Sequence, residues 1–314
     1  MKKNFYFIFL FSFASFFWTS CDKDDMPSTI NIPDENFESR LIELGYDDVL
    51  DGYINPDSVS WVYKLNLYDC GIDDLTGIEL FEDLNVLTCG GNPLTFLDVS
   101  NNESLRELSC TNAPLTRLDV SNNPQLKVLD CSETLISDLD VSYNVRLTSL
   151  ICSKTQIAEL DVSNNAQLTY LDCSETLIPE LDVTGINLLE NLLVHGTELE
   201  SLDISQNLNL ELLVFGSTNI TDIDVSNNTS LIFISCRWSK LTGLDVSNNP
   251  GLIHLNCSTN ELTGLDVSNN PKLISFECIE NPQLSCIKVS EYQLNNIPDG
   301  WVKDSSAEYS TNCY

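Results

Sequence analysis

Residues Pro114-Leu-Thr-Arg-Leu-Asp-Val-Ser-Asn-Asn-Pro-Gln-Leu-Lys-Val-Leu-Asp-Cys-Ser-Glu-Thr134 are the best-preserved copy of a phrase that recurs along most of this 314-residue chain. One leucine of the phrase recurs nine times, 21 residues apart and without an insertion: Leu105, Leu126, Leu147, Leu168, Leu189, Leu210, Leu231, Leu252 and Leu273. A fixed period of this length is typical of stacked coils, because one such unit cannot bury its apolar face alone. The repeat therefore predicts a recognition surface rather than a catalytic pocket.

Each unit has two halves of similar pattern, as in Leu126-x-x-Leu129-x-Cys131 followed by Ile136-x-x-Leu139-x-Val141. Apolar residues end each half at alternate positions, which indicates a short strand with one buried face. We therefore expect a mainly-β repeat fold, a solenoid with two short strands per 21-residue coil.

These phrases resemble the leucine-rich-repeat family, in particular its 21-residue bacterial class with Leu-x-x-Leu-x-Cys and Leu-Asp-Val-Ser-x-Asn phrases. The resemblance covers residues 61–281. It departs from the family where an asparagine is common, a position at which Asn92, Asn260 and Asn281 are kept. The other units carry Thr134, Thr155, Thr176, Thr197, Thr218, Ser239 and Ala113. A threonine hydroxyl can still bond turn backbone with less reach, whereas Ala113 cannot.

Terminal repeats need polar covers. Residues 32–60 are expected to form an N-terminal cap with a helix, since Phe37, Leu41 and Ile42 fall on one helical face and Gly45 can end it. Residues 282–314, with Cys286, resemble the irregular closing cap of the family. The expected solenoid between the caps is 61–281.

The first residues have the pattern of a secretory signal: Lys2 and Lys3 precede an apolar run over 5–18, too short to span a bilayer. Residues 1–20 are therefore interpreted as a signal peptide and 21–31 as a lipidated tether. The segment Cys21-Asp-Lys-Asp-Asp25 resembles the export signal of Bacteroidota surface lipoproteins, which implies lipidation at Cys21 and a location on the outer face of the outer membrane. Cleavage with free secretion is the alternative.

The chain carries a formal net charge of −32 at pH 7. Such a surface repels nucleic acid and anionic lipid headgroups, so we expect no nucleic-acid partner and membrane contact only through the lipid anchor. It suits basic partners or cations, or is simply a solvated acidic exterior.

Eight of the twelve cysteines recur at one inward strand position: Cys89, Cys110, Cys131, Cys152, Cys173, Cys236, Cys257 and Cys278. Val194 and Phe215 occupy that position in two units, which indicates that cysteine acts here as a small buried hydrophobe. Stacked neighbours about 4.8 Å apart are too distant for disulfides, and a straight column does not converge on zinc. Cys286 and Cys313 lie off the column, and we expect them to pair. Cys70 stays unassigned.

A column of aspartates follows the second half of each unit: Asp98, Asp119, Asp140, Asp161, Asp182, Asp203, Asp224, Asp245 and Asp266. We expect each carboxylate to accept hydrogen bonds from the following Ser-Asn-Asn turn. A row of calcium ions is the alternative, but one aspartate per coil supplies few of the six to eight oxygens that calcium prefers. A calcium loop at 45–52 is disfavoured because Val49 and Ser58 occupy ligand positions.

The sequence predicts neither a cofactor nor an enzyme. His195 and His254 belong to units about 14 Å apart and cannot share a metal or a proton. A two-strand coil also offers no deep cleft for paired catalytic carboxylates.

The outward positions of the first strand are polar in early units and apolar or aromatic later. The expected partner-binding patch consists of Tyr170, Leu193, Leu212, Val214, Phe233, Arg237, Trp238 and His254. Exposed apolar and aromatic side chains with an arginine are the usual composition of an interaction hot spot. The alternative is that a loop or the chain's own cap covers these residues, or that they have drifted without consequence.

We therefore expect a monomeric surface lipoprotein that binds another protein, in adhesion or host contact, and this binding role is what the family resemblance implies. Two alternatives stay open: a glycan-capturing protein that stacks sugars on its aromatic residues, and an envelope spacer without a ligand.

Overall fold

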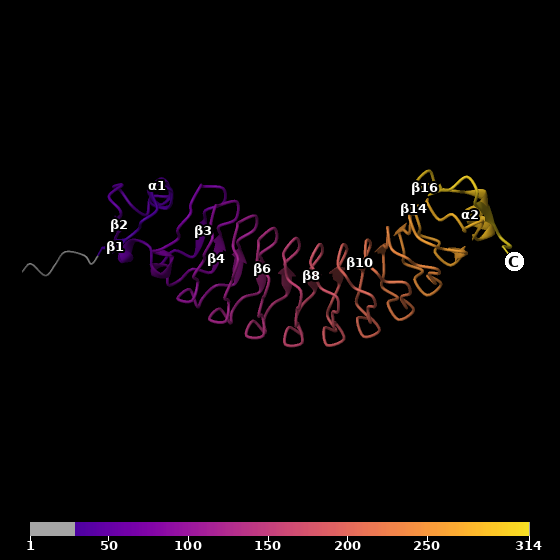
Figure 1. The fold of residues 1–314 in the computed structure, drawn as a ribbon, viewed down its shortest axis with the longest axis horizontal. Coiled ribbons are helices and arrows are strands. Elements are labelled where there is room, and N and C mark those ends of the chain that lie inside the picture. Colours follow the sequence, from indigo (N-terminus) through magenta and orange to yellow (C-terminus); the bar gives the residue numbers. More distant parts are fainter. Residues whose placement is uncertain (1–28, 314) are drawn as a thin grey trace, which may run out of the picture.

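The computed structural model describes residues 29–313, which form one curved rod of stacked coils (Figure 1). The predicted signal peptide, most of the predicted tether and Cys21 lie outside the described residues. The expected solenoid is confirmed: each coil adds one short strand, and the chain winds along the arc in sequence order.

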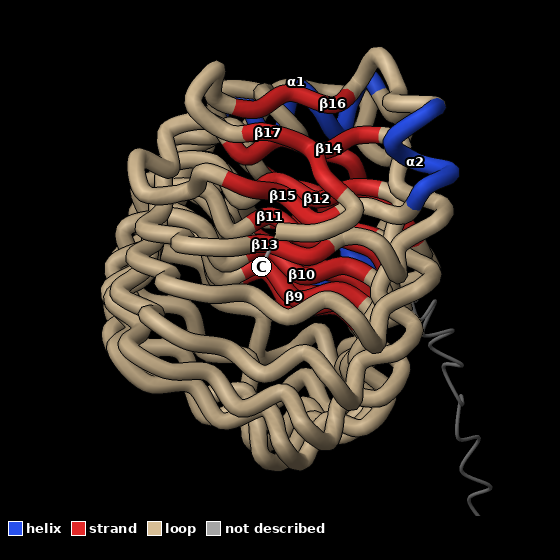
Figure 2. Tube along the Cα trace, turned by 90° about the vertical axis from the view of Figure 1, so that its right-hand side faces the viewer, coloured by secondary structure: helices blue, strands red, loops and turns tan. Residues whose placement is uncertain are grey.

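A parallel sheet of twelve strands runs along the rod, on the inner half of the arc (Figures 1 and 2). Its strands, in spatial order, are β3 (Lys64–Asn66), β4 (Val86–Thr88), β5 (Glu107–Ser109), β6 (Val128–Asp130), β7 (Ser149–Ile151), β8 (Tyr170–Asp172), β9 (Asn191–Leu193), β10 (Leu212–Val214), β11 (Phe233–Ser235), β12 (His254–Asn256), β14 (Ser275–Cys278) and β16 (Trp301–Lys303). We call the outward side of this sheet the concave face.

The expectation of two strands in every coil is wrong. The second half of the unit forms strands only near the C-terminal end, in a parallel sheet of β13 (Leu265–Asp266), β15 (Cys286–Lys288) and β17 (Glu308–Ser310). In other coils this half keeps about one backbone bond to its neighbour, such as Gln156 N–H to the Ile136 carbonyl at 2.9 Å. The coils fan apart on the outer, convex side (Figure 1), and strand pairing needs close, regular spacing between neighbours.

The N-terminal cap contains the antiparallel pair β1 (Ile30–Asn31) and β2 (Tyr53–Ile54), helix α1 (Glu35–Glu43) and the 3₁₀ turn η1 (Pro56–Ser58). Asp34 caps α1 by accepting the Phe37 N–H at 2.8 Å. Phe37 and Leu41 are fully buried, and the buried Glu38 accepts the N–H groups of Asp51 and Gly52. These bonds place the carboxylate of Glu38 inside the 45–52 loop and hold its backbone.

The closing cap is continuous with both parallel sheets, because β15, β16 and β17 all come from residues after 281. It also contains helix α2 (Glu291–Asn295), and the structure joins Cys286 to Cys313 in a disulfide. The 3₁₀ turn η2 (Ile78–Leu80) lies in the first, less regular coil. Within residues 29–313, no helix has the length and apolar character needed to cross a membrane.

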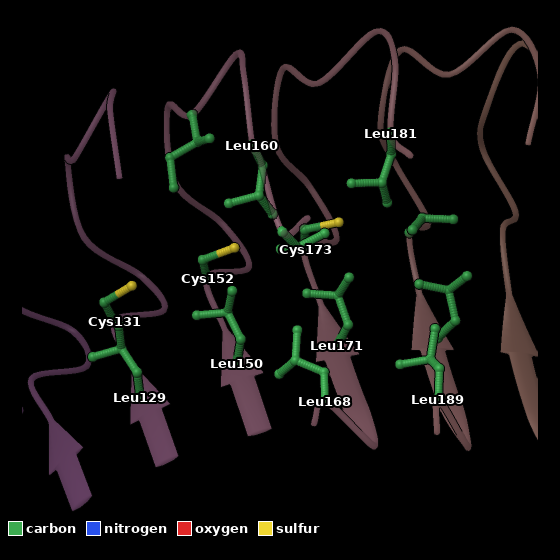
Figure 3. Close-up of a cluster of buried hydrophobic side chains, with 14 of the residues drawn as sticks. Leu129, Cys131, Leu150, Cys152, Leu160, Leu168, Leu171, Cys173, Leu181 and Leu189 are labelled. Atoms are coloured by element: carbon green, nitrogen blue, oxygen red, sulfur yellow. The ribbon is translucent and has the colours of Figure 1, made fainter. Parts of the chain in front are cut away.

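The core is a set of side-chain columns that run the length of the rod. Figure 3 shows Cys131, Cys152 and Cys173 in line, beside the leucines Leu129, Leu150 and Leu171 of the same coils. All eight column cysteines are buried as free thiols, and Val194 and Phe215 are buried at the same position. Burial raises the pKa of the Cys89 thiol to about 12, so these thiols stay protonated and behave as apolar core residues.

Candidate binding surface on the concave face

The strands of the concave face each turn two side chains outward. The middle residue of each three-residue strand is buried, and the first and third residues form two columns across neighbouring coils. From β8 to β12, the first column is Tyr170, Asn191, Leu212, Phe233 and His254, and the third column is Asp172, Leu193, Val214, Ser235 and Asn256.

Five of the eight predicted patch residues come together in these columns. Leu212 lies beside Phe233, and the Phe233 ring lies 5.6 Å from the His254 ring between centroids. Leu193 lies beside Val214 in the neighbouring column.

Tyr170 stands apart from the other patch residues, because Asn191 separates it from Leu212. Burial raises the pKa of its phenol, and the carboxylates of Asp172 and Asp130 raise it further. Tyr170 is therefore a neutral hydrogen-bonding group at the acidic side of the patch.

Arg237 and Trp238 lie beyond the end of β11, in the turn that leaves the sheet. The Arg237 guanidinium lies 4.0 Å from the centroid of the Trp238 ring, and the tryptophan is 53% exposed. Trp238 has a φ of 60°, a left-handed conformation that disfavours bulky residues. The equivalent residue two coils earlier is Gly196, with a φ of 68°. Other coils adopt the same left-handed φ with non-glycine residues, at 55° for Ser217 and 57° for Thr259, so the turn itself places the Trp238 side chain here.

Sequence reasoning missed three isoleucines that extend the patch. Ile232, Ile253 and Ile274 each precede a strand of the concave face and are joined from coil to coil by backbone hydrogen bonds of 2.9 Å. Ile232 is 40% exposed and Ile274 is 63% exposed. The sequence contains a pattern that could have revealed them: the three isoleucines stand 21 residues apart, at the position that Glu190 and Glu211 occupy in the two preceding units.

We call the combined set the apolar band. It consists of Leu193, Val214, Leu212, Phe233, Ile232, Ile253 and Ile274. Exposed glutamates Glu190 and Glu211 border its first half, and Glu277 borders its second half from the opposite column.

The convex side carries the aspartate column, and every member performs the turn-capping role expected of it. Each carboxylate accepts the N–H of the residue two positions later; for Asp119, Asp161 and Asp203 the distance is 2.9 Å. A groove of about 760 Å³ runs along Asp161, Asp182 and Asp203. Within residues 29–313, no group of three or more His, Cys, Asp or Glu side chains is arranged to hold a metal ion.

These turn bonds make stability depend on pH. The side-chain bond from Ser163 and its backbone N–H lower the pKa of Asp161, and Thr184 lowers that of Asp182 in the same way. A lowered folded-state pKa gives stability that is full above the unfolded value of about 4 and is lost as the pH falls through the folded value. Asn can accept the same turn bond without titrating, so the melting temperature of an Asp161→Asn, Asp182→Asn variant should fall less than that of the parent on acidification from neutral pH. Equal falls in thermal melts would contradict this.

A buried asparagine column runs beside the aspartates and was not anticipated. The asparagine four residues after the aspartate donates from Nδ2 to two carbonyls of the preceding coil; Asn123 reaches Val99 at 2.9 Å and Asn102 at 3.0 Å. Its members are Asn102, Asn123, Asn144, Asn165, Asn207, Asn228, Asn249 and Asn270, all fully buried. In the closing cap, Gln293 of α2 donates to the Val267 and Asn270 carbonyls and so continues the column.

The threonines that depart from the family pattern keep one hydrogen bond each. Thr134, Thr155 and Thr176 donate from the hydroxyl to the carbonyl three residues earlier, at 2.7–2.8 Å. Asn260, which keeps the family residue, donates to three carbonyls and accepts the Leu241 N–H. Threonine thus satisfies the turn with less reach, as expected.

Comparison with known proteins agrees with this architecture. No protein-family model matches the chain, and no curated protein matches it. Among solved structures, the functional domain of InlJ from Listeria monocytogenes, described as including a cysteine ladder, is 31% identical, with a TM-score of 0.73 over 90% of this chain and 72% of that chain.

Two further structures share the fold at lower identity. An internalin, InlF, from Listeria monocytogenes is 17% identical, with a TM-score of 0.68 over 88% of this chain and 96% of that chain. A leucine-rich-repeat protein of Leptospira interrogans is 20% identical, with a TM-score of 0.64 over 72% of this chain and 62% of that chain.

The fold and its exposed concave sheet define a repeat scaffold of the kind that binds proteins. The chain belongs to the leucine-rich-repeat family of bacterial proteins, and its own column of buried cysteines is similar to a cysteine ladder, the feature described for InlJ.

Proposed function

We propose that this protein is a non-enzymatic, monomeric surface lipoprotein that binds a protein partner on the concave face, in adhesion or host contact. The observation that carries the proposal is the apolar band. Seven apolar side chains meet there on neighbouring strands. In the earlier coils, the outward apolar residues are single ones between polar neighbours: Val128 lies between Glu107 and Ser149, and Ile151 between Asp130 and Asp172. Apolar surface of this kind, rimmed by charge, is typical of interaction sites.

Capture of the partner should depend on Phe233. In pull-downs from bacterial and host surface extracts, Phe233→Ala is expected to weaken capture roughly thirtyfold, the effect of truncating an aromatic hot-spot residue. Trp238→Ala should weaken it as well. Both side chains are partly exposed, so the melting temperature should stay unchanged.

The matched control is Phe96→Ala. Phe96 is 70% exposed and lines a hollow with Asp98 on the convex side, away from the apolar band. Phe96→Ala makes the same substitution at a solvent-exposed site outside the band, and capture should be unaffected. Unaltered capture by both Phe233→Ala and Trp238→Ala would rule out the concave patch as the binding site.

The lipid anchor is tested separately. Cys21→Ser should abolish incorporation of labelled palmitate and release the protein from the outer membrane, whereas Cys70→Ser should do neither. In intact cells carrying the native protein, added protease should degrade the repeat domain. Protection from protease without cell lysis would contradict display on the outer face.

The glycan alternative receives less support from the geometry. Sugar stacking needs open aromatic faces, and Arg237 covers one face of Trp238 at 4.0 Å. Tyr170 and Phe233 lie three strands apart, with Asn191 and Leu212 between them. Glycan-array binding that survives Phe233→Ala would nevertheless favour it, and an envelope defect with no captured partner would favour a structural spacer.

A further inference from the structure

We infer that the apolar band receives an amphipathic α-helix whose flanks are basic, and that it docks diagonally across β9 to β14. This inference rests on the proposed protein-binding function and names the partner's chemistry.

The band follows a diagonal rather than a column. It begins at Leu193 and Val214, the third residues of their strands, and passes through Leu212 and Phe233, the first residues of theirs. It ends at Ile253 and Ile274, one residue before β12 and β14. Four strand-to-strand steps of ~4.8 Å give about 19 Å along the rod, and three residues of ~3.3 Å give about 10 Å across it. The band is therefore about 22 Å long and inclined by roughly 30° to the rod.

These dimensions match a helix. A helix rises 1.5 Å per residue, so about 15 residues span the length of the band. A helix is also about 10–12 Å wide, which is close to the width of the concave face between the third strand residues and the isoleucines. Apolar residues at i, i+4, i+7 and i+11 would follow the diagonal as one continuous stripe.

An extended segment fits less well, for a hydrogen-bonding reason. Strands β9 to β12 are each paired on both sides, so this face offers no free strand edge. A bound strand would press unpaired backbone N–H and C=O groups against apolar side chains, which is unfavourable. A helix satisfies its own backbone and presents only side chains.

The charge around the band selects a basic helix. Glu190 and Glu211 occupy one side of the diagonal at its first half, and Glu277 occupies the other side at its second half. Arg237, beyond the end of β11, has its guanidinium over the Trp238 ring. A docked helix would thus have carboxylates along both flanks, which favours Lys and Arg there and speeds association at low salt.

The test uses labelled synthetic peptides of about 15 residues, the length of the band. One peptide carries leucines at helical spacing and lysines elsewhere; a second replaces lysine by glutamate; a third places prolines at its centre; a fourth rearranges the first to an alternating pattern. Binding to the mature chain with Cys21→Ser is measured by fluorescence anisotropy at low and high salt.

The lysine helix is expected to bind at least about tenfold more tightly than each of the other three peptides, with the preference over glutamate reduced by salt. Ile274→Asp should weaken its binding about tenfold, and a Glu190→Lys, Glu211→Lys variant should erase the preference for lysine over glutamate. Phe96→Ala should change nothing. Equal binding of the proline or alternating peptide, or of the glutamate peptide, would overturn the inference.

Failure here is distinguishable from failure of the proposed function. If Phe233→Ala abolishes capture from surface extracts but the parent binds none of the peptides, the concave face binds protein and the helix inference is wrong. If neither capture nor peptide binding depends on the band, both are wrong.

Discussion

Replacing Phe215 with cysteine should lower the free energy of unfolding by about 3 kcal/mol, although the change extends the cysteine column by one coil. Phe215 is fully buried and is among the largest buried side chains of the described core. Cysteine would leave most of the space of the ring empty, and neighbouring coils pack against both sides of it, which limits collapse into the void.

The matched control is Val194→Cys in the preceding coil. Val194 occupies the same column and is also fully buried, but valine and cysteine are close in volume, so a loss below about 1 kcal/mol is expected. Urea unfolding followed by circular dichroism would measure both values. A Phe215→Cys variant no less stable than Val194→Cys would show that the ring does not fill the core as described.

Asn123→Ala should cost about 2–3 kcal/mol of unfolding free energy. The Asn123 amide donates to the Val99 and Asn102 carbonyls at 2.9 and 3.0 Å, in a fully buried site. Each carbonyl keeps a backbone N–H partner in its own turn, from Asn102 and Leu105 respectively. The variant therefore loses two hydrogen bonds of about 1 kcal/mol each and gains a small cavity, without fully orphaning either acceptor.

Its neighbour Asn122 supplies the control, because Asn122→Ala makes the same substitution at an exposed position of the same turn. That change should stay within about 0.5 kcal/mol of the parent. Equal losses in the two variants, measured by urea unfolding, would mean that the buried column contributes nothing beyond the turn itself.

The buried asparagine column is interrupted in one coil, and this coil lacks the amide that links neighbouring coils. Ile186 stands where the other coils place the asparagine and is buried, so an apolar side chain fills the space while the inter-coil bonds are lost. Gln293, in contrast, comes from a helix and still reaches both carbonyls of the last asparagine turn. The closing cap thus ends the rod by supplying donors that the repeat no longer provides.

The concave site was only partly predictable. The outward columns followed from strand periodicity, so Leu212, Phe233 and Leu193 could be named from the sequence. The isoleucine column was overlooked because it lies one residue before the alternating pattern begins. Its exposure depends on where each strand starts, which the backbone hydrogen bonds of Ile232 and Ile253 fix.

The sequence by itself determined the winding of this protein. The 21-residue period, the inward leucines and cysteines, and the aspartate of each turn are local patterns, and each acts through burial or a hydrogen bond within two or three residues. Only the tertiary structure decided how the coils meet. Curvature of the arc keeps the second half of most coils unpaired. Residue 216 is a glycine because a Cβ there would collide with the carbonyl oxygen of Arg237 in the next coil. The diagonal band likewise arises from coil-to-coil register, since residues that are distant in the chain become neighbours only when parallel strands align.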